Sequence, residues 1–364
     1  MRRTASRGTT IRAAALSAAL ACCWLSAGAA SAATKHTAKP PAPREVSLEW
    51  VGDIALSSER GLPPAGVPAA LAPVAPLLRD ADLTAGNLEG TLSVGGISKC
   101  GGIGGSNCFA FQAPPIVAGQ LHGVGFDVLN QANNHSMDYG PSGRTQTVGA
   151  LNAAHIAHTG FPGQITVVRA AGIRIAFLGF APYPYDGDLL DIPAAQALVR
   201  TARQRASLVV VIIHAGAEGA GELHTPYGTE YYLGEDRGDA RAFAHAVIRA
   251  GASIVLGSGP HVIRGIERYR GRLIAYSLGN FVGYHTLAGG GVLSASGILR
   301  VTLDTAGRVL AGRWLSIALS DGLPRPDPSN APARLVATLS REDFPSDHFD
   351  IGPTGIFRGL SARG

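Results

Sequence analysis

Six short segments of the sequence share one pattern, in which an apolar run ends and a polar group that can bind a metal or move a proton follows. The segments are "VGD" (Asp53), "GNLE" (Asn87, Glu89), "ANNHSMD" (Asn134, His135, Asp138), "IIHAGAE" (His214, Glu218), "GPHV" (His261) and "SLGNF" (Asn280). Carboxylates, amides and neutral imidazoles are ligands for hard to borderline divalent metals. Such ions can generate hydroxide at neutral pH and stabilise an oxyanion, while a further histidine protonates a leaving group.

Each of these residues also has a simpler interpretation. Asp53 fits a turn or a helix cap, and Glu89 fits a solvated turn. Asn134 fits a left-handed turn position, and His135 fits a surface loop. His214 is harder to explain in this way, because it follows the five apolar residues "VVVII" and a buried strand end has little use for an imidazole. The recurrence favours the whole set rather than any single member.

The elements that position these groups alternate between strands and helices. Apolar runs separated by amphipathic segments predict a buried α/β sheet. Strands are predicted over 45–56, 83–93, 127–135, 207–218, 253–262 and 272–282, and hairpins over 165–184 and 297–319. Helices are predicted over 68–81, 116–126, 142–155, 194–206 and 239–252. In α/β sheets, ligands bind outside the carboxyl ends of the strands, so the six segments are expected to meet at one rim.

Composition and linkers predict one large domain. The chain has 364 residues, of which 46% are hydrophobic and 16% are charged, a composition typical of a folded protein. No proline-rich linker interrupts residues 45–320, which we predict to form a single domain. Residues 321–364 are predicted to be a proline-rich tail with one short helix.

The first 32 residues have the pattern of a secretory signal peptide, with a basic start, an apolar segment and "ASA" at 30–32. Residues 33–44 then read as a solvated linker. A retained membrane anchor is the alternative, because the apolar run approaches the roughly 17 residues that span a bilayer. The signal segment carries four arginines and no acid, so its removal lowers the formal charge from +5 to +1. With no basic stripe elsewhere, we expect no nucleic-acid partner.

Two cysteines remain after the signal segment, Cys100 and Cys108 in "KCGGIGGSNC". Export makes a disulfide the favoured interpretation. A metal site built on cysteine alone is the alternative, and it would need more ligands than these two.

Six motifs occur in the order of the CapA family of capsule and poly-γ-glutamate synthesis proteins, which the chain resembles over about residues 46–305. They are "VGDIAL", "GNLEGTL", "NQANNHSMDYG", "IIHAGAE", "GPHVIRGIE" and "IAYSLGNFV". The resemblance implies a four-layer α/β/β/α sandwich similar to calcineurin-like metallophosphoesterases, with the motifs on one rim.

The resemblance also implies roles for individual residues. The implied metal ligands are Asp53, Glu89, Asn134, His214 and His261, the implied catalytic acid is His135 oriented by Asp138, and the implied pocket residues are Asn87, Glu218 and Asn280. Ala55 and Ser258 depart from the phosphoesterase pattern, because they stand where histidines are expected. The identity of the divalent metal (Mn, Zn, Fe or Mg) and its number, one or two ions, are therefore left open.

Three functions are compatible with these motifs. The first is an exported metal-dependent hydrolase that cleaves amide bonds of a poly-γ-glutamate-like polymer. The second is a metal-dependent phosphoesterase, and the third is a non-catalytic polymer-binding component of capsule assembly or export. The expected partners are an anionic polymer such as poly-γ-glutamate and other capsule-synthesis proteins, with a membrane involved only if the signal segment is retained.

Overall fold

The structure is a computed structural model that describes residues 44–58, 61–101, 108–287 and 289–359. The unit that holds them spans residues 43–364. The predicted signal peptide, and all of the predicted linker except Arg44, lie outside the described residues. No helix among the described residues is both long and apolar enough to cross a bilayer.

The larger of two main sheets has nine strands in the order β18-β17-β16-β1-β2-β5-β6, with β15 beside β1 and β19 beside β17. Its strands are β1 (Glu45–Ala55), β2 (Leu83–Leu88), β5 (Val128–Asn130), β6 (Ala157–Thr159), β15 (Asn280–Gly283), β16 (Ala295–Asp304), β17 (Val309–Ser320), β18 (Leu323–Pro326) and β19 (Ile356–Arg358). β1, β2, β5 and β6 run parallel, so their carboxyl ends lie at one edge of the sheet.

The second sheet has six strands in the order β13-β14-β12-β9-β8-β7. They are β7 (Thr166–Ala170), β8 (Ile173–Phe180), β9 (Leu208–His214), β12 (Ile254–Ser258), β13 (Ile266–Tyr269) and β14 (Arg272–Ala275). The four strands β8, β9, β12 and β14 are parallel. Every residue of β9 is buried, which explains its continuous apolar run, because a parallel strand is covered on both faces.

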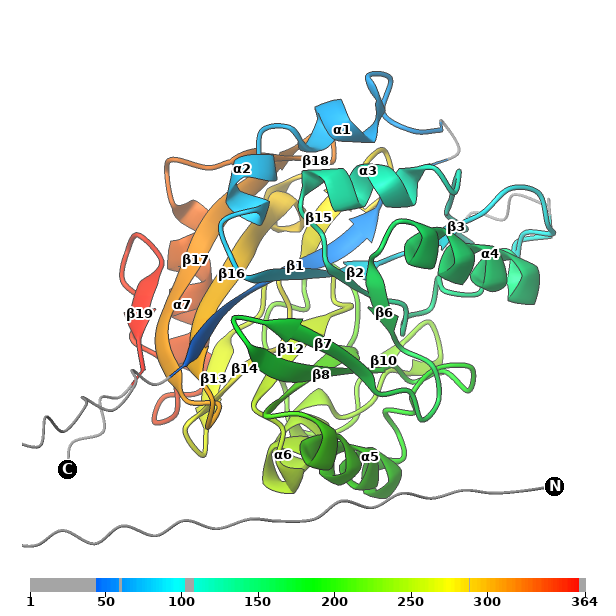
Figure 1. The fold of residues 1–364 in the computed structure, drawn as a ribbon. Coiled ribbons are helices and arrows are strands. Elements are labelled where there is room, and N and C mark those ends of the chain that lie inside the picture. The colour runs from blue at the N-terminus through cyan, green and yellow to red at the C-terminus, as the bar shows by residue number, and fades with distance from the viewer. Residues whose placement is uncertain (1–43, 59–60, 102–107, 288, 360–364) are drawn as a thin grey trace, which may run out of the picture. The chain divides into compact units, whose positions relative to one another are not determined.

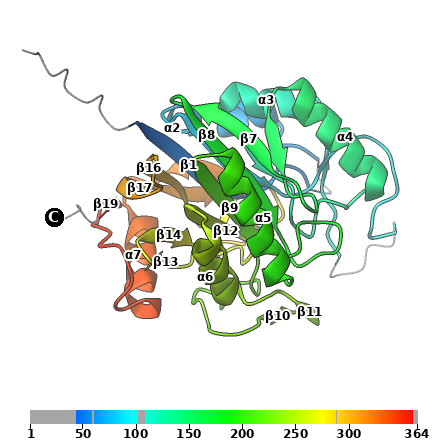
Figure 2. The same ribbon diagram turned by 60° about the horizontal axis from the view of Figure 1, so that its bottom comes forward.

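Helices cover the outer faces of both sheets, and this confirms the predicted four-layer α/β/β/α sandwich. The larger sheet packs against α1 (Gly66–Leu71), α2 (Ala75–Leu78), α3 (Val117–Val124) and α4 (Gly140–Ala153), and the second sheet packs against α5 (Ile192–Arg205) and α6 (Ala240–Ala250). Figure 1 shows the sheets between these two groups of helices, and Figure 2 shows α5 and α6 lying over the second sheet. Trp50, Phe177 and Val210 lie in the core between the sheets.

Shorter elements complete the connections near the sheet edges. They are the paired strands β3 (Thr91–Leu92) and β4 (Gln112–Ala113), the paired strands β10 (Tyr231–Tyr232) and β11 (Glu235–Asp236), and the 3₁₀ helix η1 (Gly291–Ser294).

Both predicted hairpins are present. β7 and β8 pair antiparallel around Ala171 and Gly172, which have φ of 49° and 74°. Two left-handed residues in a row match the twist of a tight hairpin. β16 and β17 form the second antiparallel pair.

The helix predicted over 68–81 is two short helices instead. α1 ends at Leu71 and α2 begins at Ala75. Pro73 lies between them, and proline ends a helix because it has no amide hydrogen and its ring clashes with the preceding turn. Pro76 is tolerated because it lies in the first turn of α2.

Residues within the predicted tail extend the folded unit. β18 and β19 pair with β17, and α7 (Ala331–Asp343) packs beside the strands. Val336 and Leu339 of α7 join the core between the two sheets. The segment packs on the sandwich because one face of α7 is apolar and is removed from water there.

Candidate metal centre and adjoining cavity

The carboxyl ends of strands from both sheets bring the predicted groups together. Asp53 of β1 pairs in register with Asn87 of β2, and Glu89 follows directly after β2. His214 is the last residue of β9 and pairs in register with Ser258 of β12. The shared rim predicted from the strand ends is therefore present.

Asp53, Glu89 and His214 form the tightest cluster of candidate ligands. One ligand atom from each lies within 4.8 Å of the others, and all three residues are buried. Nε2 of His214 lies 3.5 Å from Oε1 of Glu89, and Nδ1 lies 3.8 Å from Oδ1 of Asp53. Two carboxylates and an imidazole at this spacing are a donor set suited to a divalent cation.

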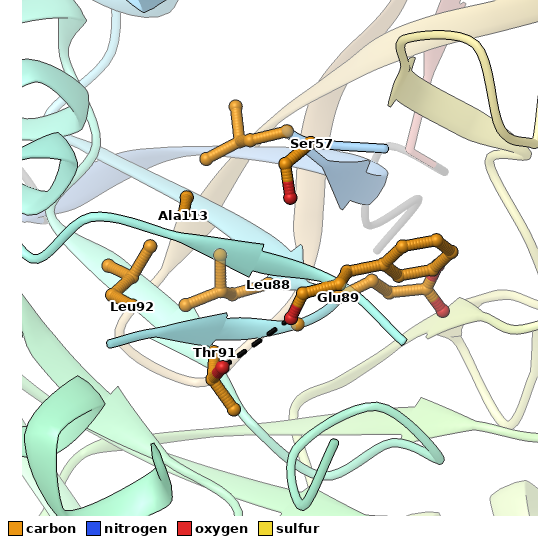
Figure 3. A pocket seen from close by; sticks show the side chains of 9 residues that line it. Ser57, Leu88, Glu89, Thr91, Leu92 and Ala113 are labelled. Atoms are coloured by element: carbon orange, nitrogen blue, oxygen red, sulfur yellow. Dashed lines mark hydrogen bonds between the residues drawn. The ribbon is translucent and has the colours of Figure 1, made fainter. Parts of the chain in front are cut away.

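Glu89 has the strongest need for such a cation. Neither of its buried carboxylate oxygens accepts a hydrogen bond from any residue that the structure describes. Burial, followed by the nearby Asp53 carboxylate, raises the pKa of Glu89 well above its usual range. A buried carboxylate without a donor is unfavourable unless a cation compensates it. Figure 3 shows Glu89 in the turn after β2, with Leu88 and Thr91 on either side along the chain.

His214 presents a nitrogen lone pair to the same place. Ser258 Oγ lies 3.3 Å from Nδ1 of His214 and 3.4 Å from the carbonyl oxygen of Ile213. A hydroxyl that donates to this carbonyl can accept a hydrogen bond from Nδ1–H of His214. The tautomer assigned from this network leaves the lone pair on Nε2, which lies 3.5 Å both from Nη2 of Arg237, a donor, and from Oε1 of Glu89. Burial lowers the pKa of His214 well below its usual value, so the ring is neutral.

Two further predicted ligands are His261, which contacts this cluster, and Asn134, which lines the adjoining cavity. Nδ1 of His261 lies 3.0 Å from Oδ2 of Asp53, while Asn87 donates to Oδ1 of Asp53 at 2.8 Å. Oδ1 of Asn134 is buried and accepts no hydrogen bond from the described part of the chain. The residues present therefore fit a divalent metal, with Asp53, Glu89 and His214 as its core ligands and His261 in contact with Asp53.

His135 and Asp138 form a pair on the segment that follows β5. Nδ1 of His135 lies 2.8 Å from Oδ2 of Asp138, and the imidazole stacks on Phe111 at 4.3 Å between ring centroids. Burial lowers the pKa of His135, although Asp138 partly opposes the change. Asn133 holds the segment against β2, since its amide donates to Leu88 O at 2.9 Å and its Oδ1 accepts from the His135 amide.

A cavity of about 600 Å³ opens beside these groups. Its lining includes the two further predicted ligands, the candidate acid, two cations, one carboxylate and several aromatic rings: Asn134, His261, His135, Lys99, Arg237, Glu218, Phe109, Tyr183, Tyr185 and Tyr232. His135 and His261, the latter in contact with Asp53 of the metal cluster, therefore face one cavity, whereas Asp53, Glu89 and His214 are buried and do not belong to its lining.

Of the three predicted pocket residues, the structure brings only Glu218 to the cavity lining. Asn87 and Asn280 are fully buried. Asn87 donates to Asp53, and Asn280 donates to the carbonyl oxygens of His261, Leu287 and Leu293. Because their amides are already engaged, these two asparagines organise the walls of the site.

Arg237 is a site residue that the sequence pattern did not single out. Its side chain is only 1% exposed, its Nη1 pairs with Oε1 of Glu218 at 2.7 Å, and its Nη2 lies 3.5 Å from Nε2 of His214. Burial favours the neutral form of Glu218, but His261 and Arg237 outweigh it and lower the pKa of Glu218 to about 2. Arg237 follows the short, exposed strand β11, which has no apolar run, so the strand-end pattern gave no signal for it.

Lys99 and Cys108 of the disulfide also line the cavity. The predicted bond between Cys100 and Cys108 is present, and Lys99, directly before it, contacts Asp138 at 2.7 Å. The two cysteines predicted the disulfide, but nothing in the sequence indicated that the neighbouring Lys99 would line the cavity and contact Asp138.

The chain is similar to proteins of bacterial capsule synthesis. The family model described as "Bacterial capsule synthesis protein PGA_cap" matches residues 47–285. The "PGA biosynthesis protein CapA" of Bacillus subtilis strain 168 is 30% identical over 256 residues, which cover 65% of this chain and 63% of that protein. The "Capsule biosynthesis protein CapA" of Bacillus anthracis is 31% identical over 179 residues, which cover 44% of this chain and 40% of that protein.

The chain thus spans less than two thirds of the length of these two relatives. Among solved structures, a 5'-nucleotidase precursor from Thermus thermophilus aligns with a TM-score of 0.43 and 14% identity, covering 82% of this chain and 59% of that one.

Proposed function

The chain belongs to the bacterial capsule synthesis protein family PGA_cap, and from that premise we propose that it is an exported metal-dependent hydrolase that cleaves amide bonds of a poly-γ-glutamate-like polymer. The names of the two Bacillus relatives connect those proteins with capsule and PGA biosynthesis. The cleavage reaction, the export and the polymer are the parts that we propose for this chain.

One observation carries the proposal: His135 of the hydrogen-bonded His–Asp pair lines the same cavity as His261, whose Nδ1 lies 3.0 Å from Oδ2 of Asp53 in the buried cluster of metal ligands. The cluster is Asp53, Glu89 and His214, and the pair is His135 and Asp138. A divalent cation bound by the cluster would supply Lewis acidity and activate water at neutral pH. Mn, Fe, Zn and Mg are the candidates, because the donors are oxygen and imidazole nitrogen.

The His135–Asp138 pair supplies the proton that amide hydrolysis needs. Hydrolysis breaks the C–N bond, adds a hydroxyl group to the carbonyl carbon and leaves a proton for the amine nitrogen. Asp138 engages Nδ1 of His135 at 2.8 Å, which leaves Nε2 to donate to the departing amine. Asp138 also stabilises the imidazolium form that must exist before the transfer.

The two cations of the cavity wall support an anionic substrate. Lys99 and Arg237 both line the cavity, and each pairs with a carboxylate at 2.7 Å. Lysine and arginine form their strongest hydrogen bonds with carboxylates and phosphates. A polymer with one carboxylate per unit can bind along this wall while one amide group lies at the metal cluster.

Export rests on the sequence of the first 32 residues, which has the pattern of a cleavable signal. A substrate outside the cytoplasm fits a chain that forms a disulfide, since such bonds persist in oxidising compartments.

The test uses the mature chain, residues 33–364, loaded with Mn²⁺ or Zn²⁺ and mixed with poly-γ-glutamate. Size-exclusion chromatography should show shortening of the polymer that stops on chelation and in His135→Ala. His224→Ala is a matched control, because His224 also pairs with an aspartate, Asp343 at 2.7 Å, but its side chain is 60% exposed and does not line the cavity. Stoichiometric metal binding without any shortening of the polymer would sink the proposed reaction. Turnover of an aryl phosphate instead would favour a phosphoesterase.

A second candidate is a non-catalytic polymer-binding component of capsule assembly. Ser258 and Ala55 favour it, because they occupy the positions where histidines were expected and both are buried. This candidate predicts polymer binding that survives chelation and His135→Ala. Loss of all binding on chelation would exclude it.

A further inference from the structure

Two residues that flank the disulfide hold the His135–Asp138 pair from different sides. Lys99 directly precedes Cys100, and Phe111 lies three residues after Cys108. Both contact the pair, although neither belonged to the predicted site.

Asp138 receives contacts from both flanks. Nζ of Lys99 lies 2.7 Å from Oδ1 of Asp138, and the backbone amide of Lys99 donates to the carbonyl oxygen of Asp138 at 2.8 Å. The backbone amide of Phe111 donates to Oδ2 at 2.6 Å. The Asp138 side chain is fully buried, so these groups and His135 set its position and its charge balance.

The same two residues, Phe111 and Lys99, also contact His135. Phe111 stacks on the imidazole with an angle of 28° between the ring planes. Nζ of Lys99 lies 3.5 Å from Nδ1 of His135 and donates to the carbonyl oxygen of Asn134 at 2.9 Å. The lysine thus contacts three features of the catalytic segment: the Asn134 carbonyl, the His135 ring and the Asp138 carboxylate.

The two flanks differ in how they are anchored. Phe111 directly precedes β4, and its carbonyl oxygen accepts from the Thr91 amide at 3.0 Å, so the β3–β4 pair holds it without the disulfide. Lys99 lies in no strand or helix. Its anchors are the Asp138 segment itself and the covalent bond at the next residue.

We propose that Lys99 is a positioning residue for the His135–Asp138 pair, and that the Cys100–Cys108 bond keeps Lys99 in place. A covalent link restricts the conformations open to the segment that carries the lysine. Reduction frees this segment, and the Lys99–Asp138 contact is lost for a large fraction of the time. The proton-donating function of His135 in this inference rests on the proposed function, whereas the positioning of its ring does not.

The experiment observes His135 directly. The mature chain is labelled with ¹⁵N-histidine, and the ring signals of His135 are assigned by their absence in His135→Gln. Spectra are compared for the oxidised protein, the protein treated with dithiothreitol, Cys100→Ser/Cys108→Ser and Lys99→Met. Dithiothreitol supplies two electrons and two protons, which convert the disulfide to two thiols while the reagent becomes its cyclic disulfide.

The reduced protein, the double serine variant and Lys99→Met are expected to show the same shifted or broadened His135 signals. Dithiothreitol should leave the double serine variant unchanged, and Lys99→Arg should restore the wild-type signals in part. In the polymer assay, all three states should lower kcat about ten-fold, because the proton donor is misplaced. KM should stay within two-fold in the reduced protein and the double serine variant, which keep the lysine, and should rise in Lys99→Met, which loses a cation of the cavity wall.

The outcomes separate the two parts of the proposal. His135 signals that are identical before and after reduction overturn the role of the disulfide. His135 signals that are unchanged in Lys99→Met overturn the role of the lysine. Because this variant keeps the disulfide, it tests the lysine even if the double serine variant does not fold. Absence of polymer cleavage in every state would refute the proposed function while the spectra still decide the positioning.

Discussion

Arg237 and His214 approach each other closely, with Nη2 of the guanidinium 3.5 Å from Nε2 of the imidazole. The same Nε2 lies 3.5 Å from Oε1 of Glu89. A fixed positive charge therefore stands beside the atoms that would bind a metal cation. Two neighbouring cations repel each other unless an anion lies between them. This relationship makes the metal-loaded site a favourable place for an oxyanion from the substrate.

Replacing Arg237 with glutamine should therefore weaken the binding of poly-γ-glutamate to the metal-loaded protein. A hydrogen bond to a charged group contributes about 1.5–3 kcal/mol, so the dissociation constant should rise about ten- to hundred-fold. Isothermal titration calorimetry with Mn²⁺ present measures this change. Arg264→Gln is the matched control, because Arg264 is also 1% exposed and pairs with Glu230 at 2.7 Å but does not line the cavity. Equal weakening in both variants would assign Arg237 a purely structural role.

Replacing Glu89 with glutamine should abolish metal binding without destabilising the metal-free protein. The carboxyl group of Glu89 accepts no hydrogen bond from the described residues, so its replacement by an amide removes a buried acidic group and no hydrogen bond. The melting temperature in chelator should stay the same or rise, while the increase caused by Mn²⁺ in the wild type should vanish.

Glu267→Gln provides the comparison for Glu89→Gln. Glu267 is also buried, but it contacts His245 at 2.8 Å and accepts from Tyr276 at 2.6 Å. This variant should lower the melting temperature and leave the increase caused by Mn²⁺ intact. A large destabilisation by Glu89→Gln in chelator would mean that Glu89 has a structural partner and is not held for a metal.

The strand-end residues could be predicted from the sequence because their position is a local property. Asp53 and His214 each follow an apolar run. Parallel strands place their carboxyl ends at one edge of the sheet, regardless of the conformation of the connecting loops. The continuous run before His214 indicated a strand buried on both faces, and β9 is such a strand. The α/β class and the two hairpins followed from the same periodicity, whereas the four-layer sandwich was implied by the resemblance to the CapA family.

Arg237 and Lys99 could not be predicted in this way, because their positions depend on long-range contacts between loops. Arg237 reaches the site through its ion pair with Glu218, 19 residues away, and Lys99 through Asp138. Asn280 was expected at the cavity because the sequence pattern places it after a strand, but it is the first residue of β15, where it pairs in register with Asp53. Its side-chain amide donates to the carbonyl oxygens of His261, Leu287 and Leu293 instead of facing the cavity. Sequence periodicity predicts where strands and helices lie, but it does not predict which groups a side chain contacts.

The Asp186 carboxyl should make the protein less stable as pH rises from about 4 to about 8. Burial raises the pKa of Asp186 to about 8, although Arg144 at 2.7 Å partly opposes this shift. The unfolded chain releases this proton near its ordinary pKa of about 3.9, so in this window the folded state holds more protons than the unfolded state. Stability from this group is present at low pH and is lost as pH approaches 8.

Asp186→Asn should remove this part of the pH dependence. Urea unfolding at pH 5, 6, 7 and 8 should show that the variant gains stability relative to the wild type with each step. A stability difference that is constant over the four pH values would show that Asp186 ionises normally in the folded state.

Gly52→Ala should disrupt the candidate metal site from within the backbone. A Cβ atom on Gly52 would lie 1.8 Å from the carbonyl oxygen of Gly279, which also accepts from the Asp53 amide at 3.1 Å. The methyl group must therefore push β1 away from this segment, and Asp53 moves with it. Urea unfolding should show a loss of about 1–3 kcal/mol or more, the range found for overpacked cores. Metal titration should show weaker binding.

Gly149→Ala separates this steric effect from the general effect of replacing glycine. Gly149 lies in α4 and is exposed, and a Cβ atom there would meet no other atom within 4 Å. Alanine in a helix is favoured over glycine by about 0.5–1 kcal/mol, so this variant should be slightly more stable and should bind metal normally. If Gly52→Ala also kept full metal affinity, the approach of β1 to Gly279 would not be what positions Asp53.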